Sequence, residues 1–290
     1  MSPPRVLAVV GPGRLGSSLA SDLAGAGVFS SVVLVGRRKE PPQAIADLLS
    51  SAGPALRYSD QPPQAPDCIV FCVPDDDLAR TAAHYARLLG PAEQADSPAV
   101  ALHVSGVHDH TALSELDRLG WTTGSWHPLK ALARAGRGQL SGVTFGVEGD
   151  PAAVSAAAEL TRILGGEVLR IDPGSKASYH AAAVFASNYL VACLHAAEQQ
   201  LKAASAGAEV GALLSLARSA IDSVERYGLE RGATGPLARG DIGTIRAHLA
   251  ALDPDSSRLY RALGRELLAA VERRLEPEKV LELRRLLEGP

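Results

Sequence analysis

The chain has 290 residues, enough for one large or two ordinary domains, and its 46% hydrophobic and 21% charged residues are typical of a globular protein. The formal net charge is −3, so the chain lacks the excess of basic residues that would indicate a nucleic-acid partner. No apolar run looks long enough to cross a bilayer, and the early first strand leaves no room for a signal peptide. The three cysteines lack metal-ligand spacing, so we expect reduced thiols in a cytoplasmic protein without a metal site.

The first predicted element is an apolar strand, Arg5–Val10, which ends at a glycine-rich turn. The turn has the pattern Gly-x-Gly-x-x-Gly, and a helix is expected to follow it to about Gly25. Strand, turn and helix together predict a dinucleotide site, because the middle glycine admits a pyrophosphate and the helix N-terminus attracts its charge. The cofactor-binding residues expected here are Gly11, Gly13, Arg14, Leu15 and Gly16. A glycine turn without a ligand is the alternative.

The second predicted strand, Ser31–Val35, is followed by a glycine and three cations, Arg37, Arg38 and Lys39. In dinucleotide folds the end of this strand meets the adenine ribose, where an acidic residue would accept the hydroxyls of NAD. Guanidinium groups suit a phosphate dianion instead, so the pattern favours NADP over NAD, with Arg37 and Arg38 as ligands. A solvated basic turn is the alternative.

A buried strand is predicted over Asp67–Val73, because this segment is apolar without alternation. Val73 and Pro74, at its end, are assigned to cofactor binding. The three aspartates that follow, Asp75–Asp77, are interpreted as the N-cap and first-turn acids of a helix that runs to Leu89. A metal site is the alternative for them.

Ala99–Val104 is a further predicted buried strand, and open sheets of this kind bind ligands at the carboxyl ends of their strands. We therefore place Ser105 and Gly106 near a nicotinamide and interpret His103, inside the strand, as a packed histidine. His127 precedes a proline, which holds it in extended backbone. It would either hydrogen-bond a substrate carboxylate or have a purely structural role.

The alternation of strands and helices continues to about Asp172 and predicts a doubly wound, mostly parallel α/β sheet. Its last strands are expected at Val143–Val147 and Glu167–Ile171, with a helix capped by Asp150 between them. No strand pattern returns after that point. We therefore expect one domain over residues 1–172 and an all-helical domain over residues 173–290.

The helical part opens with a long predicted helix, from Ser175 as its N-cap to about Ala206. At 100° per residue, one narrow polar stripe of this helix contains Lys176, His180, Ser187 and, at its margin, Asn188. The stripe faces either solvent or a site, and the small alanines beside it favour a site. Farther on, the glycine-rich segment Thr234–Asp241 contains Arg239 and Asp241, which we assign to substrate binding, with a plain inter-helix loop as the alternative.

Taken together, these residues resemble a two-domain family, the Rossmann-like proteins with a C-terminal domain of unknown function 2520. That family is related to deazaflavin-dependent NADP oxidoreductases and, more distantly, to 6-phosphogluconate dehydrogenase. The motifs that carry the resemblance are Gly11–Gly16, His103–Gly106, His127–Leu129, Tyr179–Asn188 and Thr234–Asp241. Lys130 departs from the pattern, because the family often has a glutamine there.

The resemblance implies a Rossmann domain followed by an all-helical domain, which often makes a dimer in the wider superfamily. In the hydroxyacid-dehydrogenase relatives, a lysine early in the first long helix acts as acid and base, with an asparagine or histidine one turn on. Lys176 and His180 have that spacing. The resemblance therefore implies catalytic roles for Lys176, His180 and Asn188.

We accordingly expect an NADP-dependent oxidoreductase that transfers hydride between NADPH and a small oxo or imino acid, either ketopantoate-like or a cyclic imine. Lys176 or His180 would donate the proton, and Asn188, His127 and Arg239 would orient the substrate. The expected partners are a carboxylate-bearing small molecule and a second copy of the chain, without nucleic acid or membrane. A non-catalytic NAD(P)-binding regulator or sensor is the alternative.

Overall fold

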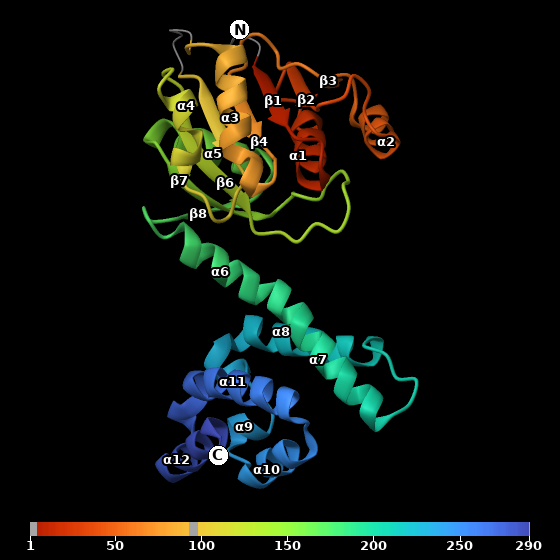
Figure 1. Cartoon of the computed structure of the whole chain (residues 1–290), viewed down its shortest axis with the longest axis vertical. Helices are drawn as coiled ribbons and strands as arrows, with labels where there is room; N and C mark the ends of the chain where they lie inside the picture. Colours follow the sequence, from red (N-terminus) through yellow and green to blue (C-terminus); the bar gives the residue numbers. More distant parts are fainter. Residues whose placement is uncertain (1–4, 93–97, 290) are drawn as a thin grey trace. The chain divides into compact units, whose positions relative to one another are not determined.

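The computed structural model describes residues 5–92 and 98–289 of the chain (Figure 1). Their contacts form two compact units, Met1–Ser187 and Asn188–Pro290. The division therefore falls later than the predicted boundary at residues 172/173. The reason is local: the first turns of the helix that starts at Lys176 pack against the sheet of the first unit.

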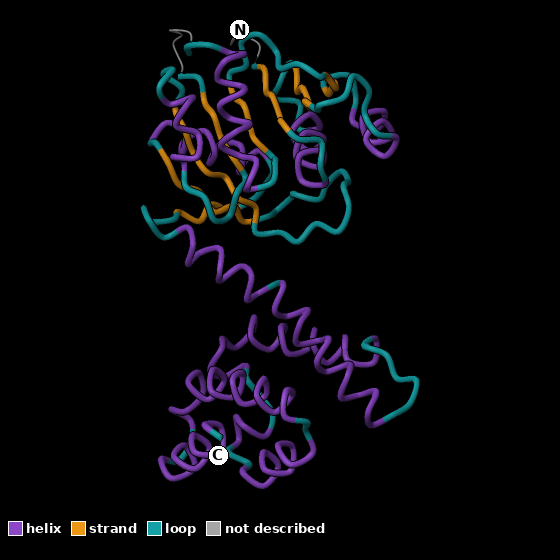
Figure 2. The backbone as a smooth tube through the Cα atoms, viewed as in Figure 1, coloured by secondary structure: helices purple, strands orange, loops and turns teal. Residues whose placement is uncertain are grey.

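The first unit is built on one eight-stranded sheet with the order β3-β2-β1-β4-β5-β6-β7-β8 (Figure 2). All neighbouring strands are parallel except β6 and β7, which are antiparallel. The predicted doubly wound, mostly parallel sheet is therefore confirmed. The strands are β1 Val6–Val10, β2 Ser31–Val35, β3 Leu56–Ser59, β4 Cys68–Phe71, β5 Val100–His103, β6 Thr122–Pro128, β7 Thr144–Gly149 and β8 Glu167–Arg170.

Helices cover both faces of this sheet, which explains why its central strands are apolar throughout. In β1, Leu7 and Val9 join one hydrophobic core and Ala8 and Val10 join the other. The first core is closed by α1 Arg14–Gly25, α2 Gln43–Ala52 and α5 Pro151–Ile163. The second is closed by α3 Asp75–Leu89, the 3₁₀ helix η1 His110–Leu113 and α4 Ser114–Asp117.

Two predicted helix caps are wrong in detail. Pro74 occupies the N-cap position of α3, so Asp75, Asp76 and Asp77 all lie in its first turn, where carboxylates meet the positive end of the helix dipole. Asp150 does occupy the N-cap position of α5, as predicted, with a proline next, but its carboxylate accepts the backbone N–H of Thr123 at 2.7 Å and makes no capping bond to the helix. In the described part of the chain, no group of three or more His, Cys, Asp or Glu residues is placed to hold a metal ion.

The long helix predicted from Ser175 is two helices, α6 Lys176–Ala186 and α7 Asn188–Ala204. They are separated at Ser187, whose φ of −124° and ψ of −72° are not helical. The Ser187 hydroxyl donates to the carbonyl of Ala183 at 2.6 Å, a bond that competes with the helical ladder. Ser175 stands at the N-cap position of α6 but makes no side-chain capping bond.

The helical stretch Lys176–Ala204 is also long and apolar enough to cross a membrane, with a mean hydropathy of 1.2 over its best window. The expectation that no run reaches this length is therefore wrong by that criterion. Alanine and valine raise the mean hydropathy of this stretch, and it contains few charged residues that would lower it. This match rests on length and composition only, and a single such helix is a weak indication of a membrane span.

The second unit is all-helical, as predicted. Its core is formed by Leu237, Ala238, Ile245, Leu268, Val271, Leu283 and Leu287. Its elements are α7, α8 Gly211–Gly232, α9 Pro236–Arg239, α10 Ile242–Ala251, α11 Pro254–Val271, the 3₁₀ helix η2 Glu272–Arg274 and α12 Pro277–Glu288. The segment predicted as a connection over Thr234–Asp241 thus contains a short helix, α9.

Candidate functional site

The glycine turn between β1 and α1 has three glycines with different roles. Gly11 has a φ of +104°, and a Cβ there would lie 2.3 Å from the carbonyl oxygen of Cys72. A Cβ on Gly16 would lie 2.1 Å from the carbonyl oxygen of Gly11. These two glycines are therefore required by the fold itself.

Gly13, by contrast, has open space where its Cβ would be, with no atom within 4 Å. It is the N-cap residue of α1 and offers no side chain to the first amides of that helix. Unpaired amides at a helix N-terminus beside an open backbone position fit the pyrophosphate of a dinucleotide. The neighbouring residues Val73 and Pro74 follow β4 next to Gly11, and the Val73 Cγ1 lies 3.2 Å from the Cβ position of Gly11.

The cations after β2 are exposed, and their segment contacts α3 and β3. Arg37 is largely exposed, and its Nη2 lies 3.6 Å from the Oδ2 of Asp77 on α3. The backbone carbonyl of Arg38 accepts the hydroxyl of Tyr58 at 3.0 Å. Both guanidinium groups stay available to a phosphate, since neither is enclosed by protein. Nothing tests their role in cofactor binding, which stays a prediction.

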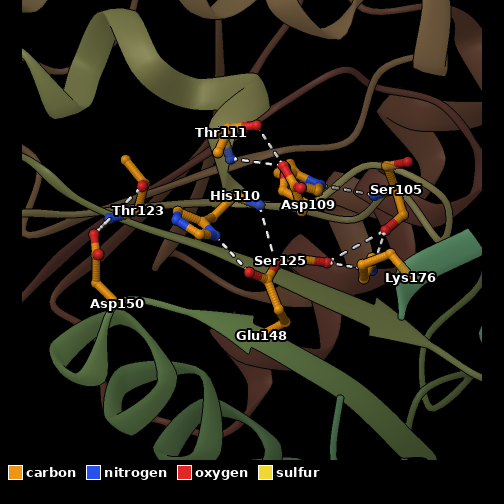
Figure 3. Close-up of polar contacts among 10 residues, drawn as sticks. Ser105, Asp109, His110, Thr111, Thr123, Ser125, Glu148, Asp150 and Lys176 are labelled. Carbon is orange, nitrogen blue, oxygen red and sulfur yellow. Dashed lines mark hydrogen bonds and ion pairs between the residues drawn. The ribbon is translucent and has the colours of Figure 1, made fainter. Parts of the chain in front are cut away.

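Lys176 belongs to a buried polar cluster near the carboxyl end of β5 (Figure 3). Its Nζ donates to the carbonyl oxygen of Ser105 at 2.9 Å and to the Ser125 hydroxyl at 2.6 Å, and the residue is only 3% exposed. Ser105 follows β5, while Ser125 lies in β6 opposite His103. Burial lowers the pKa of Lys176 to about 8, while the nearby carboxylates, led by Glu148, act in the opposite direction.

A buried carboxylate that sequence reasoning missed, Glu148, lies beside this cluster. It is directly opposite Ser125 in the antiparallel β6–β7 pair, so both side chains project from the same face of the sheet. Its carboxylate accepts the backbone N–H of His110 at 3.0 Å and pairs with the Nδ1 of the same residue (Figure 3). No sequence signal pointed to it, because the predicted strand Val143–Val147 ends one residue before Glu148, whereas β7 continues to Gly149.

His103 is fully buried, as expected for a packed histidine. Its Nδ1 accepts the backbone N–H of Ser105 at 3.2 Å, and its Nε2 lies 2.9 Å from the carbonyl oxygen of Asp109. Nδ1 therefore carries no hydrogen, and Nε2–H donates to that carbonyl. Burial is the main cause that lowers the pKa of His103 to about 4, so this imidazole is neutral in the folded protein at pH 7.

The buried neutral state of His103 predicts acid destabilisation. The unfolded chain has an ordinary histidine pKa near 6.5, so it binds the proton first as the pH falls. Stability is therefore nearly complete above about pH 6.5 and declines between pH 6.5 and pH 4, by about 3 kcal/mol for His103 alone. Urea denaturation at pH 7.0, 5.5 and 4.5 measures this loss. The decline of the free energy of unfolding with falling pH should be smaller in His103→Asn. Equal stability of the wild type at all three pH values would contradict the prediction.

His127 and His180 meet near Gly106. Their ring centroids are 5.7 Å apart, and the Nδ1 of His127 lies 2.8 Å from the hydroxyl oxygen of Tyr179 on α6. A Cβ on Gly106 would lie 2.1 Å from the Nδ1 of His180, so only glycine allows this approach. Of the predicted substrate and catalytic residues, the first unit thus brings together Ser105, His127, Lys176 and His180.

The other predicted site residues belong to the second unit. Asn188 begins α7, Arg239 ends α9, and Asp241 is the N-cap of α10. The carboxylate of Asp241 accepts the backbone N–H of Thr244 at 3.2 Å and its hydroxyl at 2.8 Å. These bonds hold the pKa of Asp241 below its usual value. Asp241 therefore has a capping role in the fold, and binding roles for these three residues stay predictions.

Comparisons with known proteins agree with this architecture. Among solved structures, the fold is similar to a Bacteroides fragilis protein proposed to be an NADP oxidoreductase, with a TM-score of 0.69 and 20% identity over 91% of this chain and 98% of the other. A Thermotoga maritima protein is similar with a TM-score of 0.69 and 20% identity over 92% of this chain and 99% of the other. An imine reductase of Streptomyces aurantiacus is similar with a TM-score of 0.62 and 17% identity over 96% of this chain and 99% of the other.

At these identities the similarity establishes the fold alone. No significant match to a curated protein was found. Residues 143–267 match a sequence family described as a domain of unknown function, DUF2520, from β7 of the sheet into α11 of the helical unit. The chain therefore combines a Rossmann-like sheet with a DUF2520 domain over residues 143–267.

Proposed function

We propose that the protein is an NADP-dependent oxidoreductase that reduces a small oxo or imino acid, with Lys176 as the proton donor. The observation that carries the proposal is the buried ammonium group of Lys176, fixed by Ser105 and Ser125 at the carboxyl end of β5. Ligands of open α/β sheets bind at such strand ends. The similarity in fold to proteins described as an NADP oxidoreductase and an imine reductase supports the reaction class.

The cofactor site would use the glycine turn and the cations after β2. The open position at Gly13 and the first amides of α1 would receive the pyrophosphate, and Arg37 and Arg38 the additional phosphate of NADP. A bound nicotinamide supplies the hydride. The protein contributes position and charge around it.

Lys176 would contribute a proton at its Nζ. Two of its N–H groups are bonded to Ser105 and Ser125, which leaves one for a substrate atom. With a pKa of about 8 it is mostly protonated at pH 7 and still acidic enough to release the proton. Its charge would also stabilise the anion that develops when a carbonyl or imine is reduced. We propose that His127 orients the substrate.

The test is a titration with NADPH and NADH, followed by NADPH oxidation with a panel of 2-oxo acids and cyclic imines. Substrate-dependent oxidation by the wild-type chain is the expected result. Tight NADPH binding without oxidation by any member of the panel would favour the non-catalytic, cofactor-binding alternative. Absence of nucleotide binding would overturn both.

Replacement of Arg37 tests the choice between the two cofactors. Because a hydrogen bond to a charged group contributes about 1.5–3 kcal/mol, Arg37→Ser is expected to weaken NADPH binding about 10- to 100-fold. NADH, which lacks the phosphate, should bind as before. Fluorescence titration gives both dissociation constants, and Arg118→Ser, which removes another exposed arginine of an ion pair, is the control. Equal losses for both cofactors would contradict a phosphate site at Arg37.

We also propose that the protein is a cytoplasmic homodimer that associates through its helical unit. Large apolar side chains are exposed on α8 and α11, among them Leu216, Ile221, Leu229, Leu259 and Leu263. Exposed apolar area of this kind is typical of protein interfaces. Free cysteines at all three positions fit a reducing compartment. Light scattering on the purified protein should give twice the mass of the chain, and a monomeric mass would contradict the proposed dimer.

A further inference from the structure

Tyr179, which the proposed mechanism does not use, contacts the ring and the backbone of His127. It lies one turn into α6, and its hydroxyl oxygen is 2.8 Å from the Nδ1 of His127. The same oxygen lies against the backbone of Gly146, which pairs with His127 across β6 and β7. A Cβ on Gly146 would lie 2.3 Å from this oxygen, so the glycine is what allows the tyrosine to approach the sheet.

The direction of the tyrosine bond follows from these contacts. The Tyr179 hydroxyl has a single hydrogen to donate. Of its two acceptors, the Nδ1 of His127 at 2.8 Å is much nearer than the His127 carbonyl oxygen at 3.4 Å. The Nδ1 of His127 is therefore an acceptor without a hydrogen, and the hydrogen of the neutral ring resides on Nε2.

Burial, reinforced by the charge of Lys176, lowers the pKa of His127 to about 4, so the ring is neutral at pH 7. His127 is consequently unsuited to act as an acid at neutral pH. Its unprotonated nitrogen, Nδ1, is already hydrogen-bonded to the Tyr179 hydroxyl. What it offers to a ligand is a single N–H donor at Nε2. This atom lies 3.0 Å from the Cβ position of Gly106.

His180 presents a donor in the same way. Its Nδ1 is buried, has no hydrogen-bond partner and faces the backbone of Gly106. A nitrogen lone pair is compatible with a neighbouring Cα–H, whereas an N–H in that position would be an orphaned buried donor, which folded proteins avoid. The hydrogen of a neutral His180 ring therefore resides on Nε2 as well.

We infer that Tyr179 is a positioning residue that fixes His127 as an N–H donor, and that His127 and His180 together bind a carboxylate group of the ligand beside Gly106. The nearby ammonium of Lys176 favours an anion at this place. Of the carboxylates that act on Lys176, Glu148 is engaged by His110 and Asp109 by Thr111, whereas Asp75, in the first turn of α3, acts on both Lys176 and His127. The inference rests on the proposed function for the identity of the ligand as an oxo or imino acid.

The first measurement is the tautomer of His127 in the full-length chain. Nitrogen-15 NMR of histidine-labelled protein distinguishes a protonated from an unprotonated ring nitrogen, and the His127 signals are identified by their loss in His127→Asn. In the wild type, Nδ1 should be unprotonated and Nε2 protonated. Tyr179→Phe should produce a mixture of the two tautomers. A protonated Nδ1 in the wild type would overturn the inference.

The second measurement is the binding of oxamate, a non-reducible analogue of a 2-oxo acid, by calorimetry with and without NADP. Tyr179→Phe should weaken oxamate about 10-fold, while its dissociation constant for NADPH changes less than twofold. The matched control is Tyr260→Phe, which removes an exposed Tyr–His Nδ1 bond of 2.9 Å in the second unit and should leave oxamate binding unchanged. Unaltered binding in Tyr179→Phe, or no binding to the wild type, would overturn the carboxylate site.

These readouts separate the inference from the proposed function. The tautomer and oxamate affinity require no turnover. If they are as expected and no substrate is reduced, the proposed reaction fails and the carboxylate site stands. If NADPH is oxidised with a substrate but Tyr179→Phe changes neither the tautomer nor oxamate binding, the carboxylate site fails and the reaction stands.

Discussion

Replacement of Lys176 by methionine should lower kcat by about 10²–10⁴, the usual contribution of a positioned acid, and change the dissociation constant for NADPH less than twofold. Methionine keeps the length of the side chain but removes the proton and the charge. It also leaves the Ser105 carbonyl without its donor, which is expected to cost about 1–3 kcal/mol of stability. A thermal melt must therefore confirm that the variant is folded at the assay temperature.

The pH profile gives an independent signature of the same residue. An acid that must be protonated to act loses activity as the pH rises through its pKa, so kcat should fall above about pH 8 in the wild type. Lys176→Met should lack this limb. Lys202→Met, which removes an exposed lysine paired with Glu198, is the matched control and should keep it. A Lys176 variant that binds NADPH weakly but retains kcat would contradict the assigned role.

The glycine turn yields the second large effect, because its glycines should respond differently to alanine. Gly11→Ala forces a side chain into a φ of +104° and against the carbonyl of Cys72, which is expected to cost about 3 kcal/mol or more of stability. Gly13→Ala should cost less than about 1 kcal/mol, because its φ of −80° is ordinary and its Cβ meets no atom within 4 Å.

Cofactor binding should nevertheless be lost in the stable variant. The Cβ of Gly13→Ala would stand where the backbone must approach the pyrophosphate, so its dissociation constant for NADPH should rise at least roughly 10-fold. Denaturation midpoints and NADPH titrations on both variants make the comparison. Wild-type affinity in a folded Gly13→Ala protein would show that the nucleotide does not bind at this turn.

Much of the fold was predictable because its signals are local. The buried strands β1, β4 and β5 appear as continuous apolar runs, since helices cover both of their faces. The glycine turn combines a strand, its glycines and a helix within about twenty residues. The break at Ser187 was missed because serine in an alanine-rich segment is compatible with a helix, and its bond to the Ala183 carbonyl is a choice made only in the folded chain.

The site was less predictable because it depends on register between distant segments. The stripe on α6 singled out Lys176 as a candidate, yet nothing local indicated that Ser125 and Glu148 would be opposite each other in β6 and β7. The antiparallel pairing of these strands creates that juxtaposition. The partnership of Tyr179 with His127 has the same origin, since it requires β6, β7 and α6 to meet.

The burial of Lys176 also has a consequence for folding. Its ammonium is bonded to Ser105, 71 positions earlier in the chain, and to Ser125, 51 positions earlier, so both contacts close long loops. Contacts of this kind form late, because loop-closure entropy opposes them until the intervening strands are paired. Until then residue 176 is an ordinary hydrated lysine. Its lowered pKa therefore requires that the strands carrying Ser105 and Ser125 are paired, and the rate at which an amine-reactive reagent modifies Lys176 should report whether they are.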